Sequence, residues 1–124
     1  MHLIRIVTDS DGESHFDQVE VTMPEARFAP PAPPFRVSEP MDAEQALFCT
    51  IPAGYFGDWH PAPHRQIAAI LGGRAEVGVS DGESRVFGPG DAVLLEDVSG
   101  RGHTTRVLGD EDFRLLFAQL PAES

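Results

Sequence analysis

The sequence contains no lysine, and all nine of its basic residues are arginine. These arginines are scattered along the chain, whereas acidic residues number 20 and give a net charge of −11. Nucleic-acid binding needs a clustered basic face, and so does attachment to an anionic membrane surface. We therefore expect neither partner, and the acidic excess mainly favours solubility.

Cysteine and long apolar runs are also scarce. Cys49 is the only cysteine, so an intrachain disulfide is excluded and a cytoplasmic location is expected. No apolar run approaches the roughly 20 residues that a membrane-spanning helix needs. The sequence also lacks a Gly-x-Ser-x-Gly element, a glycine loop ending in Lys-Ser or Lys-Thr, and a Cys-x-x-Cys pair. These absences give no support to a serine hydrolase of the α/β type, a P-loop enzyme or a cysteine zinc site.

No segment shows a helical period, and short alternating apolar segments recur about every ten residues between turn signals. At Ser80-Asp81-Gly82-Glu83 the Asp-Gly pair favours a tight hairpin. This spacing is typical of an all-β sandwich or barrel. A length of 124 residues favours a single domain with one core. We expect strands at residues 3–7, 19–23, 46–51, 66–71, 75–79, 85–87, 92–95, 103–107 and 113–120. The predicted core contains Leu47, Ile67, Ile70, Val77, Val79, Phe87, Val93, Leu95 and Leu116.

The N-terminal third has a different composition. Residues 28–35, with Pro24 and Pro40, hold six of the eleven prolines. Proline excludes a helix interior or a central strand here and indicates an extended arm. Phe28 and Phe35 would anchor this arm to the barrel or to a partner; a proline-rich recognition motif is the alternative. We divide the domain, residues 1–124, into N-terminal strands and a proline-rich arm at 1–43 and a barrel at 44–121.

Two histidines stand in recognisable surroundings. Gly57 and Trp59 lead into His60, and the turn Pro89-Gly90-Asp91 is followed by a strand, a loop and His103. From about residue 48 to residue 119 the chain resembles the cupins, and more narrowly a group of small bacterial cupins of mostly unassigned activity. The resemblance implies an all-β double-stranded β-helix, a jelly-roll barrel.

The resemblance also implies a site. Cupins typically hold Fe, Mn, Ni or Zn with three imidazoles and one carboxylate. Here His60 and His103 match the first and last histidines, but Ala62 and Gln66 stand where the second histidine and the glutamate belong. Both replacements weaken metal affinity.

His64 could compensate for the lost imidazole, because residues 60, 62, 64 and 66 share parity along a strand. The candidate ligand set for a divalent metal is therefore His60, Gln66, His103 and His64. Trp59 and Phe56 are candidate substrate contacts, with packing as the alternative role. Glu96 or Asp97 is either an acceptor that orients the His103 ring or a turn residue.

Two functions follow from these residues. The first is a metal-dependent enzyme of oxygenase, lyase or isomerase type acting on a small organic molecule in the barrel. The second is a metal-free barrel that binds a small ligand as a sensor or carrier. The resemblance further implies a homodimer in which the N-terminal segment packs across the partner.

Overall fold

Strands alone form the regular structure of residues 1–123, the part of the chain that the computed structural model describes. No helix in this part is long and apolar enough to cross a membrane. The strands are β1 (His2–Thr8), β2 (Ser14–Glu20), β3 (Glu25–Ala26), β4 (Phe35–Arg36), β5 (Gln45–Ile51), β6 (Phe56–His60), β7 (Gln66–Gly72), β8 (Arg74–Val79), β9 (Ser84–Phe87), β10 (Ala92–Leu95), β11 (His103–Leu108) and β12 (Phe113–Gln119).

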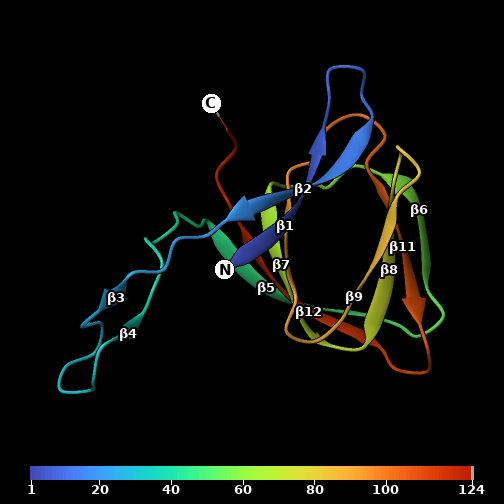
Figure 1. The fold of residues 1–124 in the computed structure, drawn as a ribbon. Helices are drawn as coiled ribbons and strands as arrows, with labels where there is room; N and C mark the ends of the chain where they lie inside the picture. The colour runs from blue at the N-terminus through green and yellow to red at the C-terminus, as the bar shows by residue number, and fades with distance from the viewer. Residues whose placement is uncertain (124) are drawn as a thin grey trace.

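The last eight strands pair in a nested order. β5 pairs with β12, β6 with β11, β7 with β10 and β8 with β9, all antiparallel. The resulting sheet orders, β10-β7-β12-β5 and β6-β11-β8-β9, are those of a jelly roll. The two sheets face each other in Figure 1. The prediction of an all-β double-stranded β-helix is confirmed.

The N-terminal ribbon, defined here as β1, the turn at residues 9–13 and β2, extends the first of these sheets. β1 runs parallel to β10, with Ile6 opposite Leu95, and β2 pairs antiparallel with β1. The sheet therefore has six strands in the order β2-β1-β10-β7-β12-β5. The expected strand at residues 3–7 is confirmed, and it joins the sheet of its own chain. The expected strand at 19–23 is wrong in position, because the pairing partner of β1 is residues 14–20.

The core lies between the two sheets and follows strand alternation. Along β7, Gln66, Ala68 and Ile70 are buried and face inward, whereas the residues between them are less buried. Ile6 has no exposed surface and belongs to the same cluster as the barrel residues. The buried members of this cluster are Ile6, Ala62, Ala68, Ile70, Ala75, Val79, Phe87, Val93, Leu95, Val107, Phe113 and Leu115.

Three predicted core residues lie elsewhere. Leu116 is only partly buried, and its neighbour Leu115 takes the inward position on β12. Ile67 packs in a second, smaller cluster with Leu3, Leu94 and Leu120. Leu47 lines the cavity between the sheets but is 39% exposed, because β5 is the last strand of its sheet.

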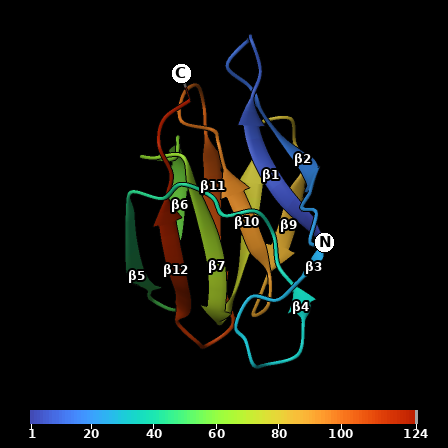
Figure 2. The ribbon, with the colours of Figure 1, turned by 90° about the vertical axis from the view of Figure 1, so that its left-hand side faces the viewer.

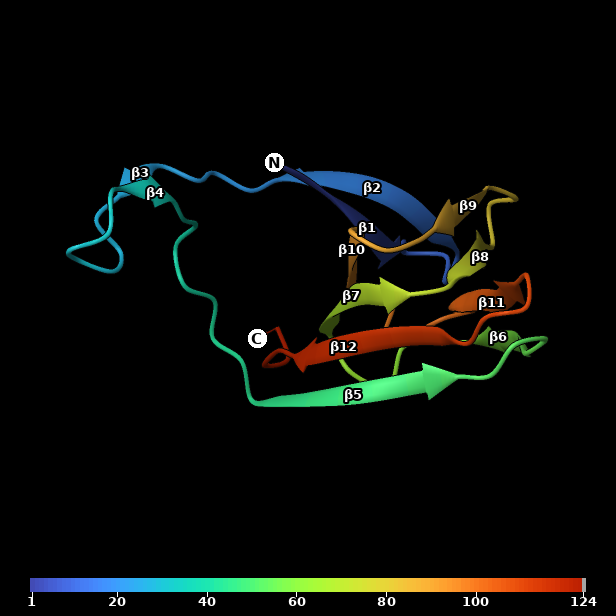
Figure 3. The same cartoon turned by 90° about the horizontal axis from the view of Figure 1, so that it is seen from below.

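Residues 21–44 form an arm that leaves the barrel, as Figures 2 and 3 show from two directions. Its regular structure is the two-residue ladder of β3 and β4. Phe28 and Phe35 pack edge to face against each other, with ring centroids 5.6 Å apart, and remain 66% and 44% exposed. They hold the arm to itself.

Candidate functional site

One cavity of about 290 Å³ lies between the two sheets. That is roughly the liquid volume of ten water molecules, and room enough for one small ring or a short chain. Most of its wall is apolar, including Ile6, Ile70, Val93 and Phe113. The polar side chains that line it are Tyr55, His60, Gln66, His103, Thr105 and Gln119.

His60 reaches this cavity because of an irregularity in β6. His103 pairs with His60, but Thr105 pairs with Gly57, so two steps on β11 match three steps on β6. This is a β-bulge, which adds one residue and changes which side chains face inward. As a result Gly57 and His60 both face the interior despite their odd spacing, and the rings of His60 and His103 lie 5.1 Å apart.

Each histidine ring is held by a hydrogen bond from its Nδ1 atom. Nδ1–H of His60 donates to the Asp58 carbonyl oxygen at 2.7 Å. Nδ1–H of His103 donates to Oδ2 of Asp97 at 2.6 Å. A carbonyl and a carboxylate can only accept, so in the neutral ring the proton sits on Nδ1 and the Nε2 lone pair is left free. Because both rings line the cavity, two Nε2 atoms are available to whatever occupies it.

Asp97 is the acceptor that orients His103, and the carboxylate has no exposed surface. Its backbone oxygen accepts a hydrogen bond from Ala62 N at 2.9 Å, which ties the β6–β7 connection to the same place. Glu96 points elsewhere, to the Arg65 guanidinium at 2.6 Å. Burial opposes the charged form of Glu96. The hydrogen bond from Arg65 and the positive charges of Arg65 and Arg5 contribute to an opposite effect that outweighs burial, so the pKa of Glu96 is lowered.

The structure brings three of the four predicted metal ligands together and leaves one out. His60, Gln66 and His103 line the cavity. His64 is exposed and lines a separate surface groove. The parity argument for His64 needed one continuous strand, but β6 ends at His60 and β7 begins at Gln66. Prolines at 61 and 63 interrupt the strand between them.

Trp59 and Phe56 are not in the cavity wall. Trp59 is 40% exposed and stacks under the Arg101 guanidinium at 5.0 Å. Phe56 is 47% exposed and stacks under Arg106 at 4.6 Å. Tyr55, which the sequence did not single out, lines the cavity, and Gly57 leaves the space that its phenol occupies.

Gln119 is a second cavity residue that sequence reasoning missed. It pairs with Gln66 across β12 and β7, so two amides lie side by side near the two imidazoles. Strand parity carried the signal, because Phe113, Leu115 and Phe117 on the same face line the cavity too.

The donor set does not fit a resident divalent metal. The cavity offers two imidazoles, two neutral amides and the hydroxyl groups of Tyr55 and Thr105, and no carboxylate of residues 1–123 lies in its wall. Among residues 1–123 no group of three or more His, Cys, Asp or Glu side chains could hold a metal ion. Ala62, at the place of the missing imidazole, is 2% exposed and lines the cavity without a donor atom. Neutral amide oxygens neither offset a divalent charge nor replace a strong nitrogen ligand.

Comparisons with known proteins give only distant similarities. No family model matches the sequence, and no curated protein matches it. The structure is similar to a conserved protein of unknown function, SPY1581 from Streptococcus pyogenes, with a TM-score of 0.47, 20% identity and coverage of 68% of this chain and 81% of that one. It is also similar to the cupin domain of Schizosaccharomyces pombe Cnp3, with a TM-score of 0.48, 18% identity and coverage of 86% and 72%. The jelly-roll assignment rests on the strand order of the chain itself.

Proposed function

We propose that this barrel binds one small organic molecule without a metal, as a carrier or sensor. The observation that carries the proposal is the cavity itself, which has an apolar wall and two imidazoles whose Nε2 atoms make no hydrogen bond to residues 1–123. Ligand pockets combine apolar walls with a few placed polar groups in this way. The apolar body of the ligand lies between the sheets, and its polar head meets His60 and His103.

The polar head belongs at one end of the cavity. His60 and His103 are paired neighbours, as are Gln66 and Gln119. The short connection from His60 to Gln66 joins the two pairs, so imidazoles and amides share one end of the barrel. His60 and Pro63 are exposed there, which supports entry of the ligand at this end.

Matched substitutions on β7 test ligand binding. Ala68 is buried and lines the cavity, whereas the adjacent Ala69 faces the other side of the sheet. With phenol, benzyl alcohol and benzoate as probes, we expect the ring resonances of His60 and His103 to shift in wild-type protein. Ala68→Met fills the cavity and should abolish the shifts, and Ala69→Met should leave them. If no probe moves either ring, the proposed function is wrong.

The metal-dependent enzyme is the competing hypothesis, and a restored ligand set separates the two. Protein purified without a histidine tag should contain Fe, Mn, Ni and Zn only in substoichiometric amounts. The double substitution Ala62→His and Gln66→Glu rebuilds the ligand set that the cupin resemblance implies, and it should bind Zn²⁺ stoichiometrically. Stoichiometric metal in the wild-type protein would favour the enzyme instead.

We also propose a homodimer in the cytoplasm. The exposed aromatic rings of the arm and the free outer edge of β5, where Phe48 is 80% exposed, support association of two copies. A chain with a single cysteine has no intrachain disulfide to form, which suits a reducing compartment.

A further inference from the structure

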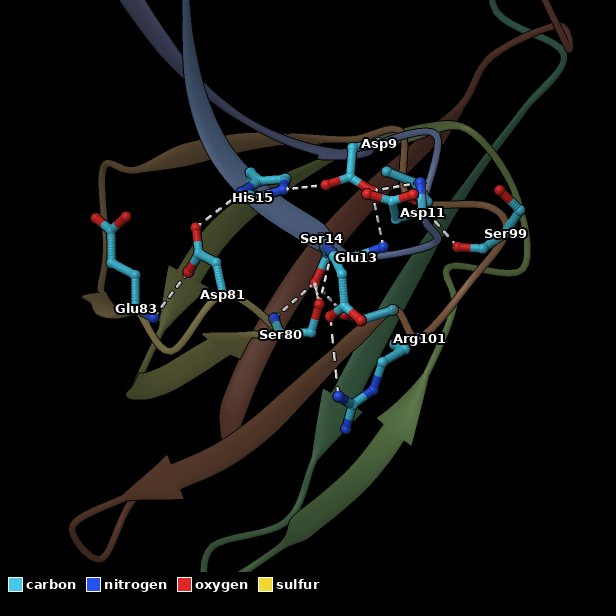
Figure 4. A network of polar contacts seen from close by, with 12 residues as sticks. Asp9, Asp11, Glu13, Ser14, His15, Ser80, Asp81, Glu83, Ser99 and Arg101 are labelled. Atoms are coloured by element: carbon cyan, nitrogen blue, oxygen red, sulfur yellow. Dashed lines mark hydrogen bonds and ion pairs between the residues drawn. The ribbon is translucent and has the colours of Figure 1, made fainter.

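The tip of the N-terminal ribbon lies against two loops of the barrel, as Figure 4 shows. One is the turn between β8 and β9, residues 80–83. The other is residues 98–102, the segment that leads into β11 and His103. The ribbon belongs to the six-stranded sheet, and its tip, residues 8–15, reaches these loops beyond the strand pairing of the barrel.

Three hydrogen bonds join the ribbon tip to the segment before His103. Thr8 Oγ1 donates to the Ser99 carbonyl at 3.0 Å, and Arg101 N donates to the Gly12 carbonyl at 3.0 Å. Ser14 Oγ donates to the Gly102 carbonyl at 2.6 Å. That last carbonyl belongs to the residue immediately before His103.

Gly102 lies directly on the backbone of His60. A Cβ atom at Gly102 would sit 2.0 Å from the His60 carbonyl oxygen. Gly102 is therefore packed against the backbone of His60 and is joined by its peptide bond to His103. Ser14 has no exposed surface, and its backbone N–H donates to Ser80 Oγ at 2.6 Å while Ser80 N donates to Ser14 Oγ at 2.8 Å. These bonds hold Ser14 in position toward Gly102.

The neighbouring residue His15 joins the two turns. Its Nε2 lies 2.6 Å from Asp9 Oδ2, in the ribbon turn, and its Nδ1 lies 2.9 Å from Asp81 Oδ2, in the β8–β9 turn. Two carboxylates can only accept, so both contacts are hydrogen bonds only when both ring nitrogens donate, that is, when the ring is an imidazolium. A neutral ring has one donor and would turn a lone pair toward one of the two carboxylates.

Other charged groups of these elements have partners of their own. Glu13 pairs with Arg101 at 3.8 Å, and Glu83 pairs with Arg85 at 3.0 Å. Asp11 donates its backbone N–H to Asp9. Asp9 and Asp81 contact His15 directly and are the two groups that raise its pKa.

We propose that the ribbon tip is a clip that positions His103 through Ser14 and Gly102, and that the His15 imidazolium between Asp9 and Asp81 keeps the clip closed. Ser14 is thus a positioning residue for the cavity. The clip makes the geometry at His103 depend on the protonation of a histidine that lies outside the cavity.

The direction of the pH dependence follows from the three groups. Asp9, then Asp81, raises the pKa of His15 above its ordinary value. The hydrogen bond to His15 is the main cause that lowers the pKa of Asp9, and the Glu83 backbone N–H is the main cause for Asp81. The clip is therefore closed from the acid side of neutrality down to the pH at which the carboxylates gain protons. It opens as pH rises through the raised pKa of His15.

An NMR titration of the full-length protein tests the clip. In wild-type protein the backbone amides of Ser80 and Gly102 should shift with the same midpoint as the His15 ring. In His15→Gln the amide resonances of Ser80 and Gly102 should have the chemical shifts of the wild-type protein at high pH, whatever the pH. In His15→Arg, which carries a permanent positive charge, they should keep the low-pH chemical shifts throughout the titration. His2→Gln is the matched control, because His2 is an exposed histidine at the other end of the ribbon with its own carboxylate, Glu20, at 2.7 Å.

Two results would overturn the clip. One is a Gly102 amide resonance that does not shift at the midpoint of the His15 titration, and the other is a set of amide chemical shifts in His15→Gln equal to those of wild-type protein. Ser14→Ala should displace the His103 ring resonances, and Ser14→Thr, which keeps the hydroxyl, should restore them. Any consequence of the clip for a ligand at His103 rests on the proposed function. If no probe binds wild-type protein, the proposed function fails, while the amide positions still decide on the clip.

Discussion

His103 donates its Nδ1–H to Asp97 over 2.6 Å, and Asp97 is fully enclosed by the fold. This pair fixes the imidazole in one tautomer and directs Nε2 away from Asp97. His60 is fixed in the same sense by a backbone carbonyl. The two rings reach the same arrangement through different acceptors, one a charged side chain in a loop and the other a backbone group next to a bulge.

Substitution of Asp97 should lower the free energy of unfolding, and more so when no acceptor for the His103 N–H remains. Asp97→Asn keeps an oxygen for the His103 N–H and removes the charge, so we expect a loss of about 1.5–3 kcal/mol. Asp97→Ala leaves the buried His103 N–H without a partner and also removes the packing of the side chain, so it should cost more, about 3–4 kcal/mol. Urea denaturation of both variants measures the difference. Equal losses would mean that Asp97 contributes packing alone.

Gly102 should tolerate no side chain. Its φ is +74°, and a Cβ atom there meets the His60 carbonyl oxygen at 2.0 Å. Gly82 is the matched control, because its φ is +100° but nothing lies within 4 Å of a Cβ. Gly82→Ala should cost about 1–2 kcal/mol, the penalty of the left-handed conformation alone. Gly102→Ala should cost about 4 kcal/mol or more and shift the His60 resonances. Similar losses in the two variants would contradict the close contact.

The fold could be predicted because its signals are local. The Asp-Gly turn at residues 81–82 and the Pro-Gly-Asp turn at 89–91 separate strands where expected. Alternation placed Ile70, Val79, Phe87 and Val93 in the core correctly. The error at Leu116 arose because both faces of Phe113-Arg114-Leu115-Leu116-Phe117 contain apolar residues. Arg114, exposed on the same face as Leu116, is the residue that distinguishes the two faces.

The site was harder to predict, because irregular backbone decides it. The cupin resemblance grouped His60 with Gln66, and strand parity added His64, but the prolines at 61 and 63 end the strand between them. The bulge at β6 depends on how β6 pairs with β11, which local sequence does not specify. The long-range contacts of Ser14 with Ser80 and Gly102 join residues more than 60 positions apart. The pentapeptide Ser-Asp-Gly-Glu-Ser occurs at residues 10–14 and again at 80–84, and neither copy predicts by itself that the two turns meet.

The N-terminal strand should prove part of the barrel core. Ile6 has no exposed surface and lines the cavity beside Leu95, its neighbour on β10. Ile6→Ala should lower the free energy of unfolding by about 2–5 kcal/mol, as for other buried aliphatic side chains. Val86→Ala, at a position that is 50% exposed on β9, should change it by less than about 0.5 kcal/mol. Thermal unfolding in one transition would agree with β1 as part of the core, and an early, separate loss of β1 would not.

The last prediction concerns the arm and the proposed dimer. A two-residue ladder is too short to be stable alone. Phe28, in the loop after β3, and Phe35, in β4, are nevertheless exposed on a segment that stands off the outer face of the six-stranded sheet. A second copy that packs against these rings would bury them. We therefore expect full-length protein to sediment as a dimer at micromolar concentration. Phe28→Ser with Phe35→Ser should shift it to monomer, and Val86→Ser, an equally exposed apolar position on the opposite sheet, should not. A wild-type chain that stays monomeric under these conditions contradicts the dimer and leaves the arm packed only on itself.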